Sequence, residues 1–377
     1  MRNVFILLML SLLNFTNVIG QNEKQYYFEL NGTINADTGK IILIFFSEFV
    51  SNDLNELEAP IENNRFSFSG YITEPQGVFV ILDNRFMSSN FILDKGTQSI
   101  TLVTDSSRKV PNVDNRIMTN DYPKYNEYFG ELRKKWDKFY GKSDSLQVHY
   151  NYNIPNTINL NLKKEDDSLR IEDKEMLLKY CKKHPNSFFA FWRLVDLLRW
   201  GYEPIYDSIY NALSEEIKGG YAGTIVSKKL NDGKLLTVGE EFPLLKCKGL
   251  NNEPFNLDVF NKNSLTLVDF WFSSCYPCRA QFNKLRNLYH QFSTHGFEIV
   301  GISIDKDSNR EHLIDVIKKD KLVWKQYWDI NGRETNQLSI NVFPTNFLID
   351  SKGVIIAKNI SMEELEVSLN KSLQQEN

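Results

Sequence analysis

The sequence predicts a C-terminal α/β domain with a mixed central sheet and helices on both faces, preceded by an all-β domain and a helical connector. Three observations predict this fold class. Short β-branched and aromatic runs occupy the chain up to residue 115, and apolar residues then recur at helical spacing up to residue 236. From residue 237 to residue 377, strand and helix patterns alternate. At 377 residues the chain is long enough for two or three domains.

Residues 1–20 have the pattern of a secretory signal peptide. Arg2 gives a positive start, residues 4–13 form an apolar run, and small or modest side chains precede the expected cleavage after Gly20. A membrane anchor is the alternative, but the run is shorter than the ~20 apolar residues that span a bilayer. No cysteine follows the expected cleavage site, which argues against a lipid anchor. We therefore expect an exported protein of the periplasm.

The composition is that of a folded protein without a strong charge bias. Hydrophobic residues make up 42% of the chain, and the formal net charge is −4 from an even mixture of acids and bases. Neither nucleic acid nor an anionic membrane surface is therefore an expected partner. Exported proteins meet an oxidising compartment, but four cysteines in a chain of this size are too few for a disulfide scaffold. The pair Cys275 and Cys278 needs its own explanation.

Residues 21–115 are predicted to form a small antiparallel β-sandwich or barrel. Turn residues such as NADTGK and DKGT separate short runs of strand composition. These runs are YYFELNGTI, KIILIFF, RFSFSGYI, GVFVIL and QSITLV. The region contains no cysteine, no histidine and no cluster of catalytic polar residues, so we expect it to bind or position rather than to catalyse.

Residues 116–236 are predicted to form a helical connector. Aromatic and apolar residues recur at spacings of three and four from Tyr122 to Phe139, and again in SFFAFWRLVDLLRW and PIYDSIYNALSEEI. Such stripes usually face a core, and we assign them to one. The stretch rich in Asn, Asp and Lys at residues 142–167 is expected to be a surface loop.

Residues 237–377 alternate between strand and helix patterns. A strand, a helix and a strand come first, then a helix, and finally two strands and a helix, which implies a mixed sheet with helices on both faces. The expected elements are strands 265–272 and 297–304, helices 277–293 and 310–319, an antiparallel hairpin of 341–350 and 354–360, and a closing helix at 361–375.

Cys275 and Cys278 stand at the junction of a buried strand and a helix, which suits dithiol chemistry. Cys275 is expected at the helix N-terminus, where backbone N–H groups and the helix dipole favour a thiolate, and Arg279 adds positive charge. Pro277 fits the first helical turn, because it lacks a donor that would be unpaired there. Three residues after Cys275, Cys278 lies on the same helical face, within reach of a disulfide.

Two other interpretations of the pair remain open. Half of a zinc site would need two more ligands, for which the nearest candidates are Cys181 and His184. A purely structural disulfide is the second, although so short a loop constrains the unfolded chain little. We favour a redox pair because a strand-to-helix junction is typical of redox motifs. Cys181 and Cys247 are expected to be buried, unpaired thiols.

The segment VDFWFSSCYPCRAQ, together with VFPTNFLID at residues 342–350, resembles the thioredoxin superfamily. More narrowly, it is similar to the exported thiol–disulfide oxidoreductases of the TlpA/ResA and cytochrome-maturation type. The resemblance covers residues 238–377 and implies a thioredoxin-like α/β fold there. The β-rich front and helical middle resemble, by layout, an uncharacterised β-rich domain and connector that precede such modules in Bacteroidetes proteins.

The resemblance implies three catalytic residues. Cys275 corresponds to the attacking thiol and Cys278 to the resolving thiol. Asp269, six residues before Cys275, corresponds to the buried acid that shuttles a proton for the resolving cysteine. An acid inside the apolar run LTLVDFWF is also costly without a purpose, and this favours a functional role on physical grounds.

The resemblance also implies a substrate-binding set around the pair. Trp271 corresponds to the residue that packs beside the disulfide, and Tyr276 and Pro277 stand between the two cysteines. Pro344 corresponds to a cis-proline that faces the disulfide, and an X-Pro bond adopts cis at modest cost. Phe343, just before it, is implied to offer backbone groups to a bound peptide.

The sequence departs from the family pattern around the cysteines. Ser274 replaces the tryptophan that precedes the nucleophile in thioredoxin, and Tyr276-Pro277 replaces Gly-Pro, so the reduction potential cannot be transferred from relatives. Gln281 and Asn283 stand where the exported reductases often carry an acid and a helix-kinking proline.

The resemblance implies an exported thiol–disulfide oxidoreductase that reduces client disulfides without a metal or cofactor, of the kind found in cytochrome c biogenesis. Its implied partners are disulfide-bonded exported proteins and an upstream thiol electron donor, membrane-bound or soluble. A client-binding adaptor or chaperone is the non-enzyme alternative. A thiol peroxidase is the weaker enzyme alternative, because Phe272 occupies the position of its usual Thr or Ser.

Overall fold

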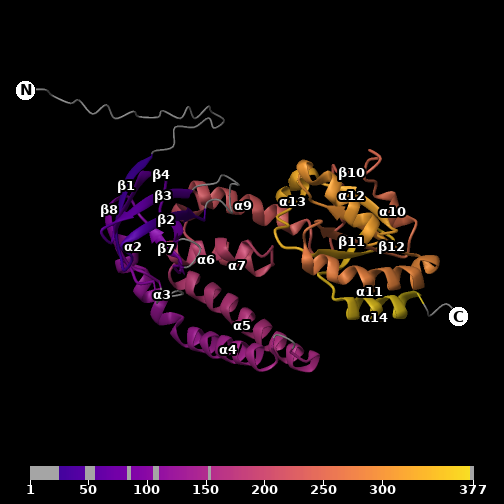
Figure 1. The fold of residues 1–377 in the computed structure, drawn as a ribbon, viewed down its shortest axis with the longest axis horizontal. Helices are drawn as coiled ribbons and strands as arrows, with labels where there is room; N and C mark the ends of the chain where they lie inside the picture. The colour runs from indigo at the N-terminus through magenta and orange to yellow at the C-terminus, as the bar shows by residue number, and fades with distance from the viewer. Residues whose placement is uncertain (1–24, 47–55, 83–85, 105–109, 152–153, 374–377) are drawn as a thin grey trace, which may run out of the picture.

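The computed structural model describes residues 25–46, 56–82, 86–104, 110–151 and 154–373. Figure 1 shows two lobes, with the N-terminal sheet and its helices in one and the C-terminal α/β fold in the other. The predicted leader, residues 1–20, lies outside the described residues. Within the described part of the chain, no helix has both the length and the apolar character needed to cross a membrane.

The N-terminal lobe contains a single sheet with strand order β6-β5-β2-β3-β4-β1-β8-β9, and β7 pairs with β5. The predicted strands are present, and the structure adds short or polar ones. The bounds are β1 Tyr26–Ile34, β2 Thr38–Phe45, β3 Glu56–Glu62, β4 Arg65–Ile72, β5 Gln76–Leu82, β6 Phe86–Met87, β7 Phe91–Leu93, β8 Gly96–Leu102 and β9 Asn112–Asp114.

The antiparallel arrangement predicted for this sheet is wrong at one pair of strands. β1 pairs antiparallel with β4 but parallel with β8. Alternation of apolar and polar residues shows which face of a strand is buried, but it does not show the direction of the partner strand. β1 and β8 are far apart in the chain, so no hairpin turn fixes their relative direction.

The helical region contacts this sheet through the helices at residues 116–120 and 188–198. Its helices are α2 Arg116–Asn120, α3 Tyr122–Tyr128, α4 Gly130–His149, α5 Asn156–Lys183, α6 Phe188–Leu198, α7 Ile205–Asn211, α8 Glu215–Lys218 and α9 Tyr221–Lys234. Sheet and helices share one hydrophobic core that extends from Phe28 to Leu230. Trp192 of α6 joins them directly, since its indole N–H donates to the carbonyl of Pro75 at 2.9 Å.

The prediction of a surface loop at residues 142–167 is wrong, because most of this stretch is helical. It forms the end of α4 and the beginning of α5, which contact each other. An ion pair joins the two helices, with Lys142 Nζ 2.5 Å from Glu165. The apolar side is narrow: Leu162 and Leu169 are the buried residues of this part of α5. Charged residues cover the remaining surface, so the helical period is weak in the sequence.

The C-terminal lobe has a mixed sheet with strand order β10-β13-β12-β11-β14-β15. β11 runs parallel to β12 and antiparallel to β14, and all seven residues of β11 are buried. The bounds are β10 Lys248–Gly249, α10 Asp258–Asn261, β11 Leu265–Trp271, α11 Tyr276–Phe292, β12 Phe297–Ser303, α12 Arg310–Lys319, β13 Lys325–Trp328, α13 Arg333–Gln337, β14 Thr345–Asp350, β15 Ile355–Lys358 and α14 Met362–Leu373.

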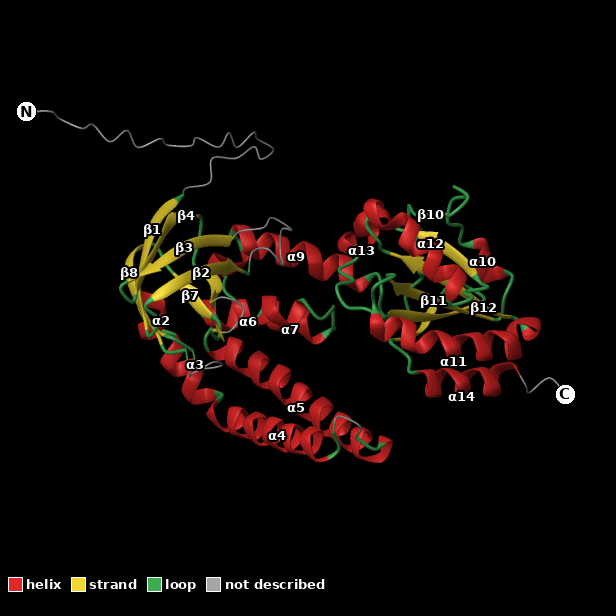
Figure 2. Ribbon diagram, in the orientation of Figure 1, coloured by secondary structure: helices red, strands yellow, loops and turns green. Residues whose placement is uncertain are grey.

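Helices cover both faces of this sheet, as predicted (Figure 2). One core contains buried residues of α11, α12 and α14, and the other contains Phe260 of α10. Leu236, two residues after α9, already belongs to the second core. The predicted C-terminal elements match within a few residues, except that β14 begins only at Thr345. The short elements β10, α10, β13 and α13 were not predicted.

Candidate active site

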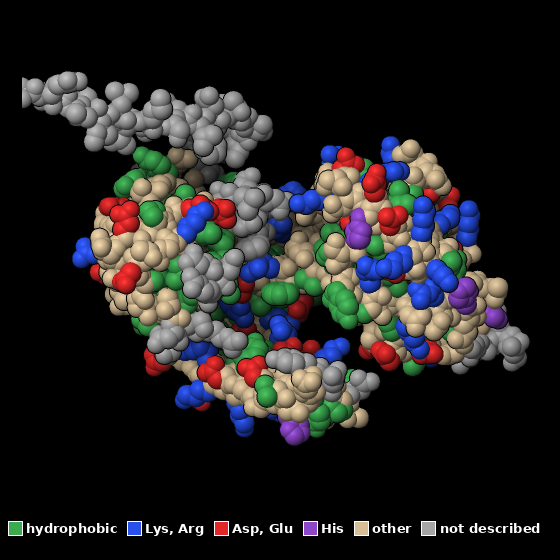
Figure 3. Space-filling model, viewed as in Figure 1, with side chains coloured by type: hydrophobic (Ala, Val, Ile, Leu, Met, Phe, Trp, Pro, Cys, Tyr) green, Lys and Arg blue, Asp and Glu red, His purple; other side chains and the backbone are tan. Residues whose placement is uncertain are grey.

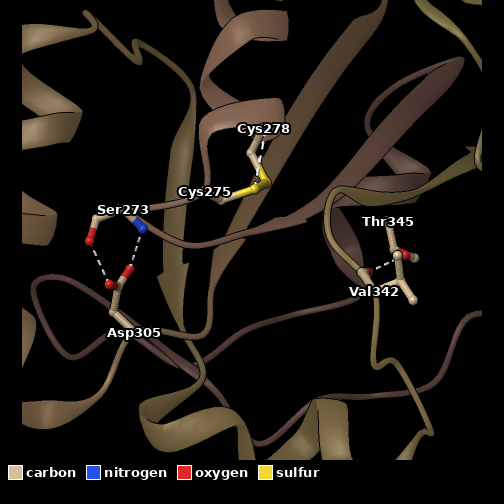
Figure 4. The surroundings of a disulfide bond; sticks show 6 residues. All are labelled: Ser273, Cys275, Cys278, Asp305, Val342 and Thr345. Carbon is tan, nitrogen blue, oxygen red and sulfur yellow. Dashed lines mark hydrogen bonds between the residues drawn. A yellow bond between two sulfur atoms is a disulfide. The ribbon is translucent and has the colours of Figure 1, made fainter. Parts of the chain in front are cut away.

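The two cysteines are joined by a disulfide at the N-terminus of α11 (Figure 4). Their Cα atoms are 5.3 Å apart. Cys275 is the N-cap residue of α11, and its Sγ accepts a hydrogen bond of 3.2 Å from the backbone N–H of Cys278. Both side chains are buried, with exposures of 3% and 1%. After reduction, the same N–H and the helix dipole would stabilise a thiolate on Cys275.

Three residues next to the cysteines differ in exposure and in charge compensation. Tyr276 is 83% exposed, and Pro277 occupies the first turn of α11. Arg279, expected to add positive charge beside Cys275, instead forms a two-pronged ion pair with Asp320, at 2.8 and 3.2 Å. Its charge is therefore largely compensated, and the helix N-terminus remains the main source of stabilisation for a thiolate.

Asp269 lies on β11 with an exposure of 3%. Its Oδ1 atom has no hydrogen-bond partner among the described residues. Burial in the apolar core raises the pKa of this carboxyl from 3.8 to about 7. A group with this pKa can take up or release a proton near neutral pH, which is the property that a proton relay requires.

Trp271 lies on the same face of the sheet as Asp269, because the two residues are two apart on one strand. It is 1% exposed and shares one hydrophobic core with both cysteines. Its ring meets that of Phe282 edge-on at 5.1 Å, and its indole N–H donates to Gln326 Oε1 at 3.2 Å. Trp271 is therefore fixed by both packing and a hydrogen bond.

The loop before β14 lies opposite the cysteine pair (Figure 4). The Phe343–Pro344 peptide bond is cis, the isomer that the resemblance implies. The hydroxyl of Thr345 donates to the carbonyl of Val342 at 2.7 Å and closes the loop. The ring of Phe343 meets that of Phe272 edge-on at 5.8 Å. The structure thus brings Phe343 and Pro344 next to the loop that leads into Cys275.

Sequence reasoning missed Asp305, a buried acid beside the site. Its carboxylate accepts hydrogen bonds from the backbone N–H and the hydroxyl of Ser273, at 2.8 and 2.6 Å, and from the hydroxyl of Ser303 at 2.7 Å. Ser273 is two residues before Cys275, so Asp305 anchors the loop that leads into Cys275 (Figure 4). One sequence signal could have identified Asp305: it is an acid at the carboxyl end of β12, which runs parallel to β11. The carboxyl ends of parallel strands form the edge where α/β sheets bind ligands.

The two remaining cysteines are free and buried. Desolvation raises the pKa of both Cys181 and Cys247 to about 12, so neither is a reactive thiolate near neutral pH. Cys181 lies in the core of the N-terminal lobe, whereas Cys275 and Cys278 lie in a C-terminal core. The structure therefore does not bring Cys181 to the pair, as the zinc interpretation required.

Comparisons with known proteins place a family in each lobe. Residues 238–358 match the AhpC/TSA family, and residues 28–122 match a domain of unknown function, DUF4369. The thiol-disulfide oxidoreductase ResA of Oceanobacillus iheyensis is 28% identical over 162 residues, which cover 41% of this chain and 82% of that protein. The sporulation thiol-disulfide oxidoreductase A of Bacillus subtilis is 27% identical over 101 residues, 26% of this chain and 61% of that protein.

Similar structures have also been solved. The thioredoxin domain of a thiol-disulfide oxidoreductase from Bacteroides vulgatus is 30% identical, with 37% of this chain and 99% of that chain covered and a TM-score of 0.33. The C-terminal domain of a putative thiol-disulfide oxidoreductase from Bacteroides thetaiotaomicron is 27% identical, with 37% and 97% covered and a TM-score of 0.34. The C-terminal lobe of this chain is thus an AhpC/TSA-family thioredoxin-like domain, homologous to the ResA-type thiol–disulfide oxidoreductases, and its N-terminal sheet belongs to a DUF4369 domain.

Proposed function

We propose that this protein is an exported thiol–disulfide oxidoreductase of the periplasm that reduces disulfide bonds in client proteins. One observation carries the proposal: Cys275 and Cys278 form a disulfide at the N-terminus of α11, beside a cis-proline loop. The homology to ResA-type oxidoreductases supports the reaction class. The signal-peptide pattern of residues 1–20 supports export.

In the first step, the Cys275 thiolate of the reduced enzyme attacks one sulfur of a client disulfide. A bond forms between Cys275 Sγ and that sulfur, and the second client sulfur leaves as a thiolate that takes up a proton. The N–H of Cys278, which donates to Cys275 Sγ at 3.2 Å, stabilises the attacking thiolate before this step. Tyr276, Pro277, Phe343 and the cis Pro344 are the residues that we propose to contact the client chain.

In the second step, Cys278 resolves the mixed disulfide. The Cys278 thiol transfers its proton to Asp269, and the resulting thiolate attacks Cys275 Sγ. The Cys275–Cys278 bond forms, and the first client sulfur leaves as a thiol once it is protonated. The client gains two electrons and two protons, and a thiol donor, membrane-bound or soluble, restores the enzyme dithiol. We place apocytochromes among the expected clients because of the resemblance to cytochrome-maturation reductases.

Reduction of insulin by the full-length chain tests this function. Cys275→Ser removes the nucleophile, so turnover should fall to the rate of the thiol donor alone. Cys247→Ala, which changes a buried thiol outside the pair, is the matched control and should retain turnover. Equal turnover of the Cys275→Ser and native chains would refute the proposal, and would leave a client-binding adaptor as the better account of the chain.

The direction of electron flow has its own test. A reductase works from its dithiol form, so rapid acid quenching of native cells and alkylation should find Cys275 and Cys278 mainly as free thiols. A fully oxidised pair would instead indicate an oxidase.

Hydrogen peroxide in place of insulin tests the peroxidase alternative. We expect no turnover with hydrogen peroxide.

A further inference from the structure

A small pocket of about 20 Å³, room for about one water molecule, lies between the two lobes beside the loop that carries Pro344. The connector lines it with Trp200, Gly201 and Tyr202, and the C-terminal lobe lines it with residues 338–342 and Thr345. Figure 3 shows that the molecular surface is hollowed between the lobes. The active-site loop thus has a neighbour from outside the thioredoxin-like domain.

The end of α6 directs Trp200 away from the core. Gly201 has a φ of +106°, a left-handed conformation that ends the helix, and its N–H donates to the carbonyl of Leu198 at 3.1 Å. Trp200, two residues after the end of α6, is 66% exposed, whereas Trp192 within α6 is 2% exposed. The exposure of Trp200 follows from the backbone of this helix end.

Short, buried connections hold Trp200 in place relative to the Pro344 loop. Tyr202 is 7% exposed and packs on Gly233 of α9 so closely that a Cβ on Gly233 would lie 2.5 Å from Tyr202 Cβ. Three residues after Gly233, Leu236 is part of the C-terminal core. The N–H of Gly239 then donates to the carbonyl of Ile355 on β15 at 2.8 Å. Trp200 is therefore two residues from a packed anchor and is not on a free tether.

We propose that Trp200 is the connector's contact to the client, so that an extended client segment touches both the exposed Trp200 ring and the Pro344 loop. The proposal rests on the proposed function and extends it to the substrate class. Val342 and Thr345, which flank Phe343 and Pro344, line the pocket together with Trp200, so a client segment that lies along this loop can also reach Trp200. A tryptophan offers a large apolar face at low entropic cost and is enriched at binding hot spots. The occupant is thus an unfolded or extended protein segment with an apolar side chain near its cysteine.

The kinetic test compares a protein disulfide with a small one. We expect Trp200→Ala to lower the ratio of kcat/KM for insulin to kcat/KM for oxidised glutathione by about fivefold or more, as the loss of one hot-spot contact does. Trp200→Phe should restore most of this ratio. Tyr71→Ala is the matched control, because Tyr71 is an aromatic residue with 68% exposure on β4 of the N-terminal sheet. A native ratio in Trp200→Ala, or an equal loss with both substrates, would overturn the proposal.

A cross-linking test addresses the geometry directly. A photoreactive phenylalanine analogue at position 200 of the Cys278→Ala chain should cross-link to insulin held as a mixed disulfide on Cys275, whereas the analogue at position 71 should not. A cross-link from position 200 to a second copy of this chain, or no cross-link from an otherwise intact mixed disulfide, would overturn the proposal. If the mixed disulfide itself does not form, the proposed function fails instead. Turnover of oxidised glutathione distinguishes the two failures, because a chain that lacks the proposed function reduces neither substrate.

Discussion

Two buried acids beside the cysteines differ in their hydrogen bonding, and this difference separates their roles. Asp305 accepts hydrogen bonds from two serines, so its carboxylate is stabilised where it stands. Asp269 has an oxygen without a hydrogen-bond partner among the described residues, and burial raises the pKa of this carboxyl to about 7. The first acid is suited to holding a loop in place, and the second to exchanging a proton.

Asp269 should make the oxidised chain less stable as pH rises. The folded state keeps this carboxyl protonated up to pH about 7, whereas the unfolded chain loses the proton near pH 3.8. Between these values the folded state binds more protons, so stability falls with rising pH and levels off above pH 7. Asp269→Asn should remove this loss of stability. Relative to the native chain, its free energy of unfolding should be nearly equal at pH 4 and higher by at most about 4 kcal/mol above pH 8. Urea denaturation of both chains from pH 4 to pH 9 measures it, and a gain independent of pH would contradict the assignment.

The same substitution separates proton transfer from folding. Because asparagine cannot accept the proton of Cys278, Asp269→Asn should slow the resolution of a preformed mixed disulfide by about tenfold or more near pH 7. Attack by Cys275 should change little. Single-turnover quenched flow resolves the two steps. Resolution at the native rate across this pH range would assign Asp269 a structural role only.

Asp305 should control the position of the nucleophile. Asp305→Asn places an amide N–H₂ against groups that donate to the carboxylate, and it should cost about 1–3 kcal/mol of local stability. We expect slower attack of Cys275 on a client disulfide and altered alkylation kinetics of this thiol. Asp307→Asn, an exposed acid two residues away, is the control. Native alkylation kinetics in Asp305→Asn would show that the loop does not depend on this anchor.

The sequence supports some of the site residues better than others, for physical reasons. A local pattern is enough to select Cys275, Cys278 and Asp269 as candidates, since a cysteine pair after an apolar strand and an acid within that strand are unusual on their own. Asp305 is brought to Ser273 only by the pairing of β12 with β11, which no local pattern reveals. The compensation of Arg279 by Asp320 likewise depends on packing between distant segments.

At the scale of elements, strands and helices with a clear apolar period are predicted well, and those dominated by polar residues are missed. β1 and β4 occupy the predicted residues. β13 is only four residues long, Lys325–Trp328, and is too short to show an alternation. Parts of the charged helices α4 and α5 were predicted as a loop, because their apolar stripe is too narrow to give a clear helical period. An ion pair between the helices and this narrow stripe hold them together in the structure. Such elements are stabilised by tertiary contacts, which sequence periodicity does not record.

The contact between β5 and α6 should be essential for the N-terminal lobe. Gly77 of β5 leaves room for two rings, and a Cβ there would lie 2.7 Å from Phe46 and 2.8 Å from Trp192. Gly77→Ala should therefore overpack the interface and destabilise the lobe by about 1–3 kcal/mol. Gly141→Ala on α4, where a Cβ meets no atom within 4 Å, is the control and should be neutral or gain up to about 1 kcal/mol. Thermal unfolding of the two variants measures the contrast, and equal effects would contradict this packing argument.

At the scale of the whole molecule, the DUF4369 sheet and the connector form one packed unit, and this unit reaches the redox domain through α9 and the turn after it. A redox domain needs only its own sheet and cysteines to react with a small disulfide. The remaining part of the chain has a hydrophobic core of its own, which contains no residue of the redox domain. It is therefore suited to selecting which proteins reach Cys275, and the identity of those proteins can be tested in the cell.

Cys278→Ala should trap the clients of this protein as covalent adducts. In the proposed mechanism the mixed disulfide is short-lived because Cys278, in the first turn of α11, attacks Cys275 Sγ. Alanine at position 278 removes this attack and leaves Cys275 in place. Expressed in its native host with residues 1–20 present, the variant should accumulate adducts of exported proteins that dissociate on reduction. Non-reducing gels followed by mass spectrometry would identify them, and apocytochromes among them would support a role in cytochrome maturation. A chain without either cysteine should carry no adducts, because the bond requires Cys275 Sγ. Adducts of equal abundance in that control would mean that they do not arise from the dithiol mechanism, and cytoplasmic clients in place of exported ones would refute export.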